Sequence, residues 1–423
     1  MALRNVVVIG GSYVGSLTNH QASLPNPLTD TFTSQGTNVA EQLAAAAQGR
    51  FRVVLIEKNS HFQHLFAFPR FAVTTAVNTH KAFIPYTAGK FGKDGVVLQA
   101  AVTGLSNSAA QLDRKVLLDG QHQDSIPYSF LVGTSHCVDK ATGADLGCQA
   151  ITTGTKLTPP SSLPGSDKLD GVTYLRKHAD KIKSSQRIVI IGAGAVGVQM
   201  ATDIKEIYPE KSVTLVHSRK NVMNKFHPGL HDIIAERAKE LGIDLVLGTR
   251  VKLPAGGYPT DRSVEVELTD GRKIPADFAI ICNGQVPQSA LLQTLAPQCI
   301  DDDGFIRTLK TLQIDDPQYP NIFALGDVAD TGAHKAARPA GRQAEIVAKN
   351  IVHLVEQEPL EEYEVQGTPA IHMSLGVTKN VVFANPAVGS SDEPRIVPRD
   401  DGTLDMNIDS VWTRRGGGPD AML

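Results

Sequence analysis

The sequence contains little cysteine, and its cysteines are far apart. Four occur in 423 residues, Cys137, Cys148, Cys282 and Cys299, and no two of them form a C-x-x-C pair. A thioredoxin-type dithiol and a paired-cysteine zinc site therefore both lack support. Four cysteines in a chain of this length are also too few for the disulfide framework of a small secreted protein.

An excess of one charge and long apolar runs are also missing. Lys and Arg total 41 and Asp and Glu total 44, so the basic excess of a nucleic-acid binder is absent and we expect no nucleic-acid partner. No apolar run reaches the ~18 residues of a membrane-spanning helix. Because the first apolar run begins at Val6 and the second residue is Ala2, we expect neither a targeting peptide nor N-myristoylation.

The composition that remains is that of a folded protein. Hydrophobic residues make up 41% and charged residues 20% of the chain, so a sizeable core can form. The length allows two or three domains at about 100–200 residues each. The 13 histidines show no metal-ligand spacing such as H-E-x-x-H, and we predict no metal site.

Two stretches of the chain repeat one pattern. Residues 5–10 (NVVVIG) and 187–192 (RIVIIG) are short β-branched runs that end in glycine, which is typical of buried parallel strands. Each opens into a glycine-rich turn and is followed by a second β-rich run, at 51–57 and 212–217. Two such units predict an α/β protein with two separate dinucleotide folds.

The sharpest motif is the sequence GAGAVG at 192–197, a complete G-x-G-x-x-G between an expected strand and an expected helix. Gly192 allows the tight turn, Gly194 lets the backbone approach a pyrophosphate, and Gly197 lets helix pack on strand. The helix N-terminus would offer free N–H groups to the phosphates. A purely structural glycine turn is the alternative, and the strand–turn–helix context favours the nucleotide site.

The N-terminal copy of the motif is GGSYVG at 10–15, in which Ser12 replaces the central glycine between Gly10 and Gly15. Serine is small enough to keep the backbone approach, and its hydroxyl could reach a phosphate. Glu57 ends the next expected strand, where an acid would hydrogen-bond a ribose 2′-hydroxyl. The alternative is an exposed glutamate at a strand end.

The second unit has no acid at the equivalent place. Its strand ends in the sequence His217-Ser218-Arg219-Lys220. Arg219 could accommodate the 2′-phosphate of NADPH, so both NADH and NADPH remain open as cofactors. The alternative is that these residues are only solvated loop charges.

Taken together, these features resemble the flavoprotein oxidoreductases with two dinucleotide folds. The similarity is carried by GGSYVG with Glu57, ITTGT at 151–155, GAGAVG, IICNG at 280–284 and ALGD at 324–327. Within that family the chain is most similar to the apoptosis-inducing-factor-homologous, mitochondrion-associated (ferroptosis-suppressor-like) group. This closer similarity lies in VTLVHS at 213–218, AGRQAEIVAKNIV at 340–352 and MSLG at 373–376.

The resemblance implies an α/β fold with two Rossmann-like domains and a small C-terminal α+β interface domain. The FAD-binding domain would comprise residues 1–164 and 277–365, interrupted by an NAD(P)H-binding domain at 165–276. The interface domain would comprise residues 366–423 and end in a flexible tail.

The resemblance also implies roles for single residues. The adenosine diphosphate part of FAD would be held by Gly10, Ser12, Gly15 and Glu57, and Arg70 would face the pyrophosphate. Gly154, Gly326 and Asp327 would complete the flavin site, with Asp327 bonded to the ribityl chain or its phosphate. NAD(P)H would be held by Gly192, Gly194 and Gly197, and Arg219 is the candidate given above for a 2′-phosphate.

One residue is expected to take part in the reaction itself. Lys335 falls where the group has a lysine near the flavin ring, and a cation there would stabilise the negative charge of the reduced flavin. Lys81 is a weaker candidate of the same kind. The alternative for Lys335 is an exposed loop lysine.

The function implied is that of a FAD-dependent NAD(P)H oxidoreductase with a small quinone-like electron acceptor. The alternatives are a flavoenzyme that modifies a specialised metabolite and a non-catalytic flavoprotein that senses NAD(P)H. We expect a monomer or homodimer without an integral membrane segment. It would be cytoplasmic, or peripheral on a mitochondrial or other membrane.

Two segments interrupt the patterns. Residues 16–36 separate the first glycine turn from its helical pattern, which resumes at Asn38, and place Glu57 47 positions after Gly10. The usual spacing of that acid is about 20 residues past the motif. Residues 133–150 likewise separate 128–132 from 151–155, which would otherwise join into one strand. We interpret both segments as retained-intron translations or gene-model errors, with genuine surface insertions as the alternative.

Overall fold

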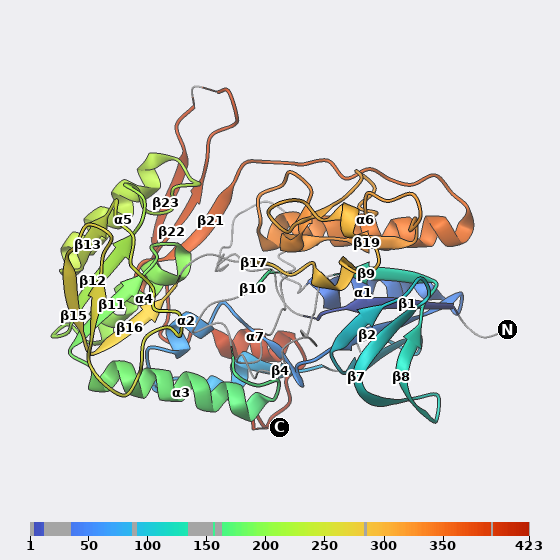
Figure 1. The fold of residues 1–423 in the computed structure, drawn as a ribbon, viewed down its shortest axis with the longest axis horizontal. Helices are drawn as coiled ribbons and strands as arrows, with labels where there is room; N and C mark the ends of the chain where they lie inside the picture. Colours follow the sequence, from blue (N-terminus) through green and yellow to red (C-terminus); the bar gives the residue numbers. More distant parts are fainter. Residues whose placement is uncertain are drawn as a thin grey trace.

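The computed structural model describes residues 4–11, 35–86, 91–133, 155–156, 163–282, 286–390 and 392–422. Two parallel sheets lie at opposite ends of the molecule (Figure 1). The α/β class with two parallel sheets, predicted from the repeated strand pattern, is confirmed. No helix among the described residues combines the length and apolar character needed to cross a membrane.

The first sheet has the strand order β19-β9-β1-β2-β5, and its neighbouring strands are all parallel. Its strands are β1 (Arg4–Ile9), β2 (Phe51–Glu57), β5 (Gly95–Gln99), β9 (Phe130–Gly133) and β19 (Ile322–Ala324). β1 and β2, predicted as strands, are buried almost throughout, as expected for strands covered on both faces.

Side chains that alternate along β1 and β2 belong to two different cores. Val6, Val8 and Val53 pack with α1 (Gln35–Ala47) and α6 (Ala337–Glu356), whereas Val7 and Val54 pack under a second, antiparallel sheet. That sheet consists of β6 (Val102–Leu105), β7 (Ala109–Leu118) and β8 (Gln121–Pro127). Because successive side chains of a strand point to opposite faces, β1 and β2 contribute to the cores on both sides of the sheet.

The second parallel sheet has the order β13-β12-β11-β16. It comprises β11 (Arg187–Ile191), β12 (Ser212–His217), β13 (Asp244–Leu247) and β16 (Phe278–Ile281). Its helices are α3 (Lys168–Ser184), α4 (Ala195–Ile207) and α5 (Pro228–Leu241), and the hairpin of β14 (Val264–Glu267) and β15 (Lys273–Ala276) shares a core with β11. α5 ends at Gly242, which adopts the left-handed conformation that glycine favours at a helix C-terminus.

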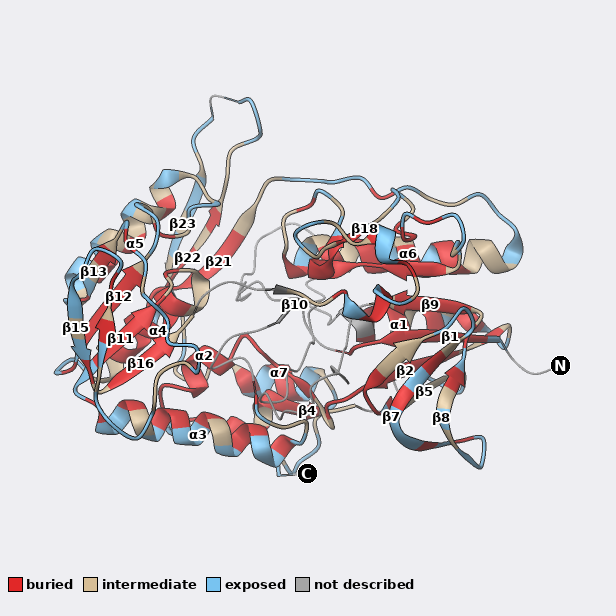
Figure 2. Ribbon diagram, viewed as in Figure 1, coloured by how far each residue is buried: buried red, intermediate tan, exposed pale blue. Residues whose placement is uncertain are grey.

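The C-terminal part contains both strands and a helix. An antiparallel sheet of β21 (Ala370–Ser374), β22 (Lys379–Ala384) and β23 (Arg395–Asp400) is followed by α7 (Ile408–Arg414). These elements lie within the expected α+β interface domain at 366–423, whose flexible tail stays a prediction. Ile408, Val411 and Trp412 form a short apolar stripe that is buried (Figure 2), and seven residues are too few for that period to stand out in the sequence.

Short elements connect these layers. β9 pairs with β1, whereas β10 pairs antiparallel with β17, so 128–132 and 155–156 lie in different sheets. The short strands are β3 (His61–Gln63), β4 (Phe83–Pro85), β10 (Thr155–Lys156), β17 (Val286–Pro287), β18 (Ile306–Arg307) and β20 (Ala329–Asp330). The short helices are α2 (Phe68–Phe71), η1 (Thr79–Ala82), η3 (Ala290–Leu292), η4 (Pro297–Cys299) and η5 (Gly326–Val328).

Candidate functional site

The first glycine turn brings the end of β1 against the end of β2. Gly10 has a φ of 92°, a left-handed conformation that favours glycine, and its N–H donates to the Ile56 carbonyl at 2.9 Å. The next N–H, of Gly11, donates to Oε2 of Glu57 at 2.5 Å. Ser12 and Gly15 lie outside the described residues, so their predicted roles stay predictions.

Glu57 is buried at the end of β2. Its side chain is 1% exposed, which rules out the alternative of an exposed glutamate. Oε1 accepts hydrogen bonds from the Asn59 backbone N–H at 2.9 Å and the Asn59 amide at 2.7 Å. Burial raises the pKa of Glu57, and the hydrogen bonds from Asn59 and Gly11 oppose that shift. The carboxylate is thus held in place at the strand end where a ribose would bind.

The second glycine turn, at 192–197, leaves open space through which an anion can approach its backbone. Gly192 has a φ of 110°, and its N–H donates to the Val216 carbonyl at 2.8 Å. A Cβ on Gly197 would overlap the Gly192 carbonyl oxygen, whereas a Cβ on Gly194 would meet nothing within 4 Å. Gly194 is also the N-cap of α4, where no side chain caps the helix. The tight turn at Gly192, the open space at Gly194 and the close helix packing at Gly197 together fit the binding of a dinucleotide diphosphate.

His217 stands at the end of β12, in the place that Glu57 has in the first unit. Its Nδ1 accepts from the Ala193 N–H at 3.3 Å, and its buried Nε2 has no hydrogen-bond partner among the described residues. Burial and the neighbouring Arg219 lower the pKa of His217. Because Nδ1 accepts a hydrogen bond, the neutral form of this ring has its proton on Nε2. Arg219 itself is exposed beside this ring.

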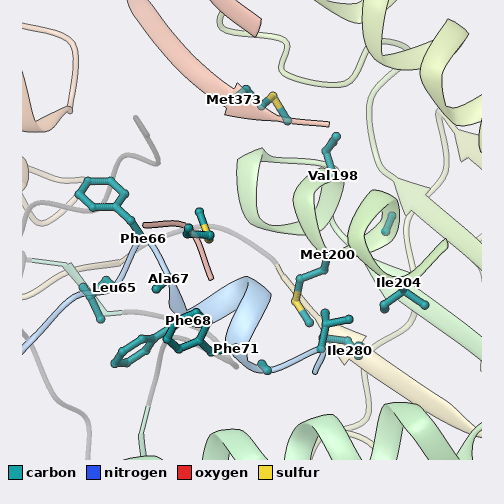
Figure 3. Close-up of a cluster of buried hydrophobic side chains, with 14 of the residues drawn as sticks. Leu65, Phe66, Ala67, Phe68, Phe71, Val198, Met200, Ile204, Ile280 and Met373 are labelled. Carbon is teal, nitrogen blue, oxygen red and sulfur yellow. The ribbon is translucent and has the colours of Figure 1, made fainter. Parts of the chain in front are cut away.

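Arg70, which the resemblance implies would face the pyrophosphate, is buried among contacts within the protein. Its side chain is 1% exposed, and its three nitrogens donate to Asp203 at 2.5 Å and to the Gly376 and Thr403 carbonyls at 2.8 Å and 3.1 Å. These contacts join α2 to α4 and the C-terminal part, and apolar side chains around them pack α2 on α4 (Figure 3). Arg70 therefore forms a buried ion pair that links these segments, and its contact with a pyrophosphate stays a prediction.

Asp327 is completely buried just beyond β19, at the carboxyl edge of the first sheet. The preceding Gly326 has a φ of 80°, and its N–H donates to the Gln343 side chain at 2.8 Å. This edge is where parallel sheets bind ligands, so the position fits the expected contact with a flavin ribityl chain. Gly154, expected at the same site, lies outside the described residues.

Lys335 is half-buried, which differs from an exposed loop lysine. Its Nζ donates to the Ala329 carbonyl and lies 4.6 Å from the centre of the Phe305 ring. Burial lowers the pKa of Lys335, while Asp327 and other carboxylates oppose that shift. Lys81, the weaker candidate, pairs with Asp409 of α7 at 2.7 Å.

Two residues near the first turn carried no recognisable sequence signal. A Cβ on Gly11 would lie 2.8 Å from the hydroxyl oxygen of Tyr86, and Arg415 lines a cavity together with Tyr86. Both residues are isolated in sequence and meet only in the folded chain. Among the described residues, no group of three or more His, Cys, Asp or Glu side chains could hold a metal ion.

Known proteins share this architecture. The family model described as pyridine nucleotide-disulphide oxidoreductase matches residues 35–344. Fe-regulated protein 8 of Mycosarcoma maydis is 33% identical over 430 residues, covering 98% of this chain and 95% of that protein. Ferroptosis suppressor protein 1 of Mus musculus is 29% identical over 330 residues, covering 76% and 79%. The structure of the sulfide:quinone oxidoreductase from Aquifex aeolicus superposes with a TM-score of 0.67 at 17% identity, covering 98% and 92%, which shows a shared fold.

Proposed function

Since the chain belongs to the pyridine nucleotide-disulphide oxidoreductase family, we propose that it is a FAD-dependent NAD(P)H oxidoreductase with a quinone-like electron acceptor. One observation carries the proposal. In each parallel sheet an inner strand, β1 or β11, is followed by a glycine turn that begins at Gly10 or Gly192. The N–H of the next residue donates to the side chain that ends the neighbouring strand. Two such turns in one chain suit two dinucleotides.

We assign FAD to the first unit and NAD(P)H to the second. The buried carboxylate of Glu57 suits a ribose hydroxyl and would repel a 2′-phosphate. Asp327, at the carboxyl edge of the same sheet, would accept a hydroxyl of the ribityl chain. The open face at Gly194 would receive the nicotinamide dinucleotide. The domain boundaries expected from the resemblance are part of this proposal.

The bound cofactors would supply the hydride chemistry, so the protein has to position them and exclude water. Lys335 would place a positive charge near the flavin ring, and burial among Phe305 and the Ala329 carbonyl holds its ammonium in one position. Such a fixed cation favours the more negatively charged, reduced state.

The acceptor is proposed to be small rather than a protein disulfide. Cys282 and Cys299 are free, and burial raises their pKa values to about 12 and about 11, so neither thiol is activated. Together with the absence of a C-x-x-C pair, this leaves no dithiol relay within the described residues. The sulfide:quinone oxidoreductase, which shares the fold, supports a quinone as the acceptor class.

The test is turnover with a panel of acceptors. Purified protein is loaded with FAD, and oxidation of NADPH and NADH is followed with a soluble quinone, ferricyanide, oxygen or a disulfide. The proposal predicts that the quinone is reduced fastest and the disulfide not at all. Flavin binding without reduction of any acceptor would point instead to a non-catalytic flavoprotein.

A further inference from the structure

A cavity beside the first glycine turn is lined by three distant parts of the chain. Thr37 and Glu41 come from α1, Phe62 lies in β3, Tyr86 directly follows β4, and Arg415 follows α7. The position of α7 therefore places Arg415, near the C-terminus, beside residues of the N-terminal unit. Among the described residues that line this cavity, it is the one cation.

The Tyr86 hydroxyl lies against the turn itself. A Cβ on Gly11 would approach its oxygen to 2.8 Å, so only a glycine leaves room for it. The hydroxyl is buried and has no hydrogen-bond partner among the described residues. Burial and the neighbouring Glu57 raise the pKa of Tyr86 well above its ordinary value, so the group stays a protonated donor. A buried donor at a glycine turn is suited to an anionic oxygen.

Several contacts fix the position of Arg415. Its guanidinium carbon lies 4.0 Å from the centre of the Phe62 ring. The helix that precedes it is anchored by Trp412, which is 4% exposed and has Lys168 above its ring at 5.0 Å, and by the ion pair of Lys81 with Asp409. The positive charge of Arg415 therefore stands at the cavity, directly after a packed helix. Arg414, one residue earlier, is exposed.

We propose that Tyr86 and Arg415 bind the diphosphate of the dinucleotide held by the first unit. This rests on the proposed function, which places FAD there. A guanidinium and a hydroxyl donate hydrogen bonds to phosphate oxygens, and Arg is the side chain best matched to phosphate geometry. Arg415 thus supplies the cation that the resemblance assigned to Arg70, whose nitrogens are used by Asp203 and two carbonyls.

Titration of flavin-free protein with FAD tests the proposal. Trp412 is the one tryptophan of the chain and sits on α7, so its fluorescence reports binding. We expect Arg415→Gln to weaken FAD binding by about tenfold or more, and Arg415→Lys to restore part of the loss. Tyr86→Phe should weaken binding several-fold. Arg414→Gln, the matched control at the neighbouring exposed arginine, should bind FAD like the parent protein.

A readout of charge separates binding from folding. The dissociation constant for FAD should rise more steeply with salt in the parent protein than in Arg415→Gln, because one phosphate contact is lost. Thermal unfolding of the flavin-free variants checks that they remain folded. Equal FAD affinity and equal salt dependence of Arg415→Gln and the parent protein would overturn the proposal while leaving the proposed function intact. Failure of the parent protein itself to bind FAD would overturn both.

Discussion

The two dinucleotide-binding units share one backbone design and differ at one side chain. In both, the first glycine donates to the carbonyl of the neighbouring strand, from Gly10 to Ile56 and from Gly192 to Val216. In both, the following N–H donates to the side chain that ends that strand. That side chain is the carboxylate of Glu57 in the first unit and the imidazole of His217 in the second.

This difference shows that the residue at the strand end has two separable roles: it accepts the hydrogen bond that fixes the turn, and its charge affects which dinucleotide can bind. Either side chain accepts the backbone N–H, so the turn needs only an acceptor there. The charge differs, however: a carboxylate favours a ribose hydroxyl, whereas a neutral imidazole beside Arg219 leaves room for a 2′-phosphate. The same fold can therefore select two dinucleotides through one residue in each unit.

The largest expected effect comes from removing Asp327, which breaks the first unit alone. Asp327→Ala should weaken FAD binding about 10- to 100-fold, because a buried acceptor for the ribityl hydroxyls is lost. NADPH binding by the second unit should be retained in an equilibrium titration. Asp330→Ala, at an exposed neighbouring carboxylate, is the control. Full flavin content in Asp327→Ala would show that the ribityl assignment is wrong.

The glycines of the second unit allow its turn to be broken in two different ways. Gly197→Ala should destabilise the protein by about 1–3 kcal/mol, since the new Cβ overlaps the Gly192 carbonyl. Gly194→Ala should leave stability nearly unchanged, because its Cβ enters open space, and instead raise the KM for NADPH about tenfold or more. Thermal unfolding and steady-state kinetics measure the two effects. An unchanged KM in Gly194→Ala would mean that no diphosphate approaches this face.

His217→Glu makes the second unit resemble the first. The carboxylate should still accept the Ala193 N–H, and it should repel a 2′-phosphate. We expect the ratio of kcat/KM for NADPH to that for NADH to fall about tenfold or more, a change of at least about 1.4 kcal/mol. His217→Gln, which adds no charge, is the control. A fall of the same size in His217→Gln would point to lost geometry rather than repulsion.

The sequence already predicted the parts that this comparison uses. The β-branched runs at β1 and β11, the glycine turns and Glu57 follow local rules of period and conformation, and each lies where expected. The helical pattern from Asn38 likewise falls within α1. Such features are visible because every residue that defines them lies within a few positions of the next.

Other parts depend on contacts between segments that are distant in sequence. The expected pyrophosphate contact of Arg70 came from the resemblance, whereas its ion pair with Asp203, 133 positions away in the sequence, leaves no local signal. The short α7 was missed because its apolar stripe spans two turns, and Arg415 becomes notable only once α7 is packed. Tertiary packing decided these cases, and a single sequence does not encode it in a local pattern.

Lys335 offers a smaller test within the flavin-binding unit. Lys335→Ala should lower kcat about threefold to tenfold and leave the KM for NADPH almost unchanged, because the charge acts on the reduced state rather than on nucleotide binding. The control is Lys310→Ala, at an exposed ion pair with Glu362. Unchanged turnover with a quinone would show that Lys335 has only a structural role, through its contacts with Ala329 and Phe305.

The smallest expected difference is that between the two nucleotides in the unaltered protein. Without an acid at the end of β12, NADPH and NADH should be used within about tenfold of each other, a gap of at most about 1.4 kcal/mol. Initial rates at matched concentrations measure it. A preference for NADH beyond about a hundredfold would contradict the interpretation of His217 and Arg219.

The central claim, that the two units hold two different dinucleotides and pass a hydride between them, is tested most directly by anaerobic mixing. FAD-loaded protein is mixed with NADPH in the absence of an acceptor, and the visible absorption of the flavin is followed. The account predicts that this absorption is lost with one equivalent of NADPH and returns when a soluble quinone is added. A protein that binds both dinucleotides, yet keeps its flavin oxidised in excess NADPH and NADH, would contradict the account.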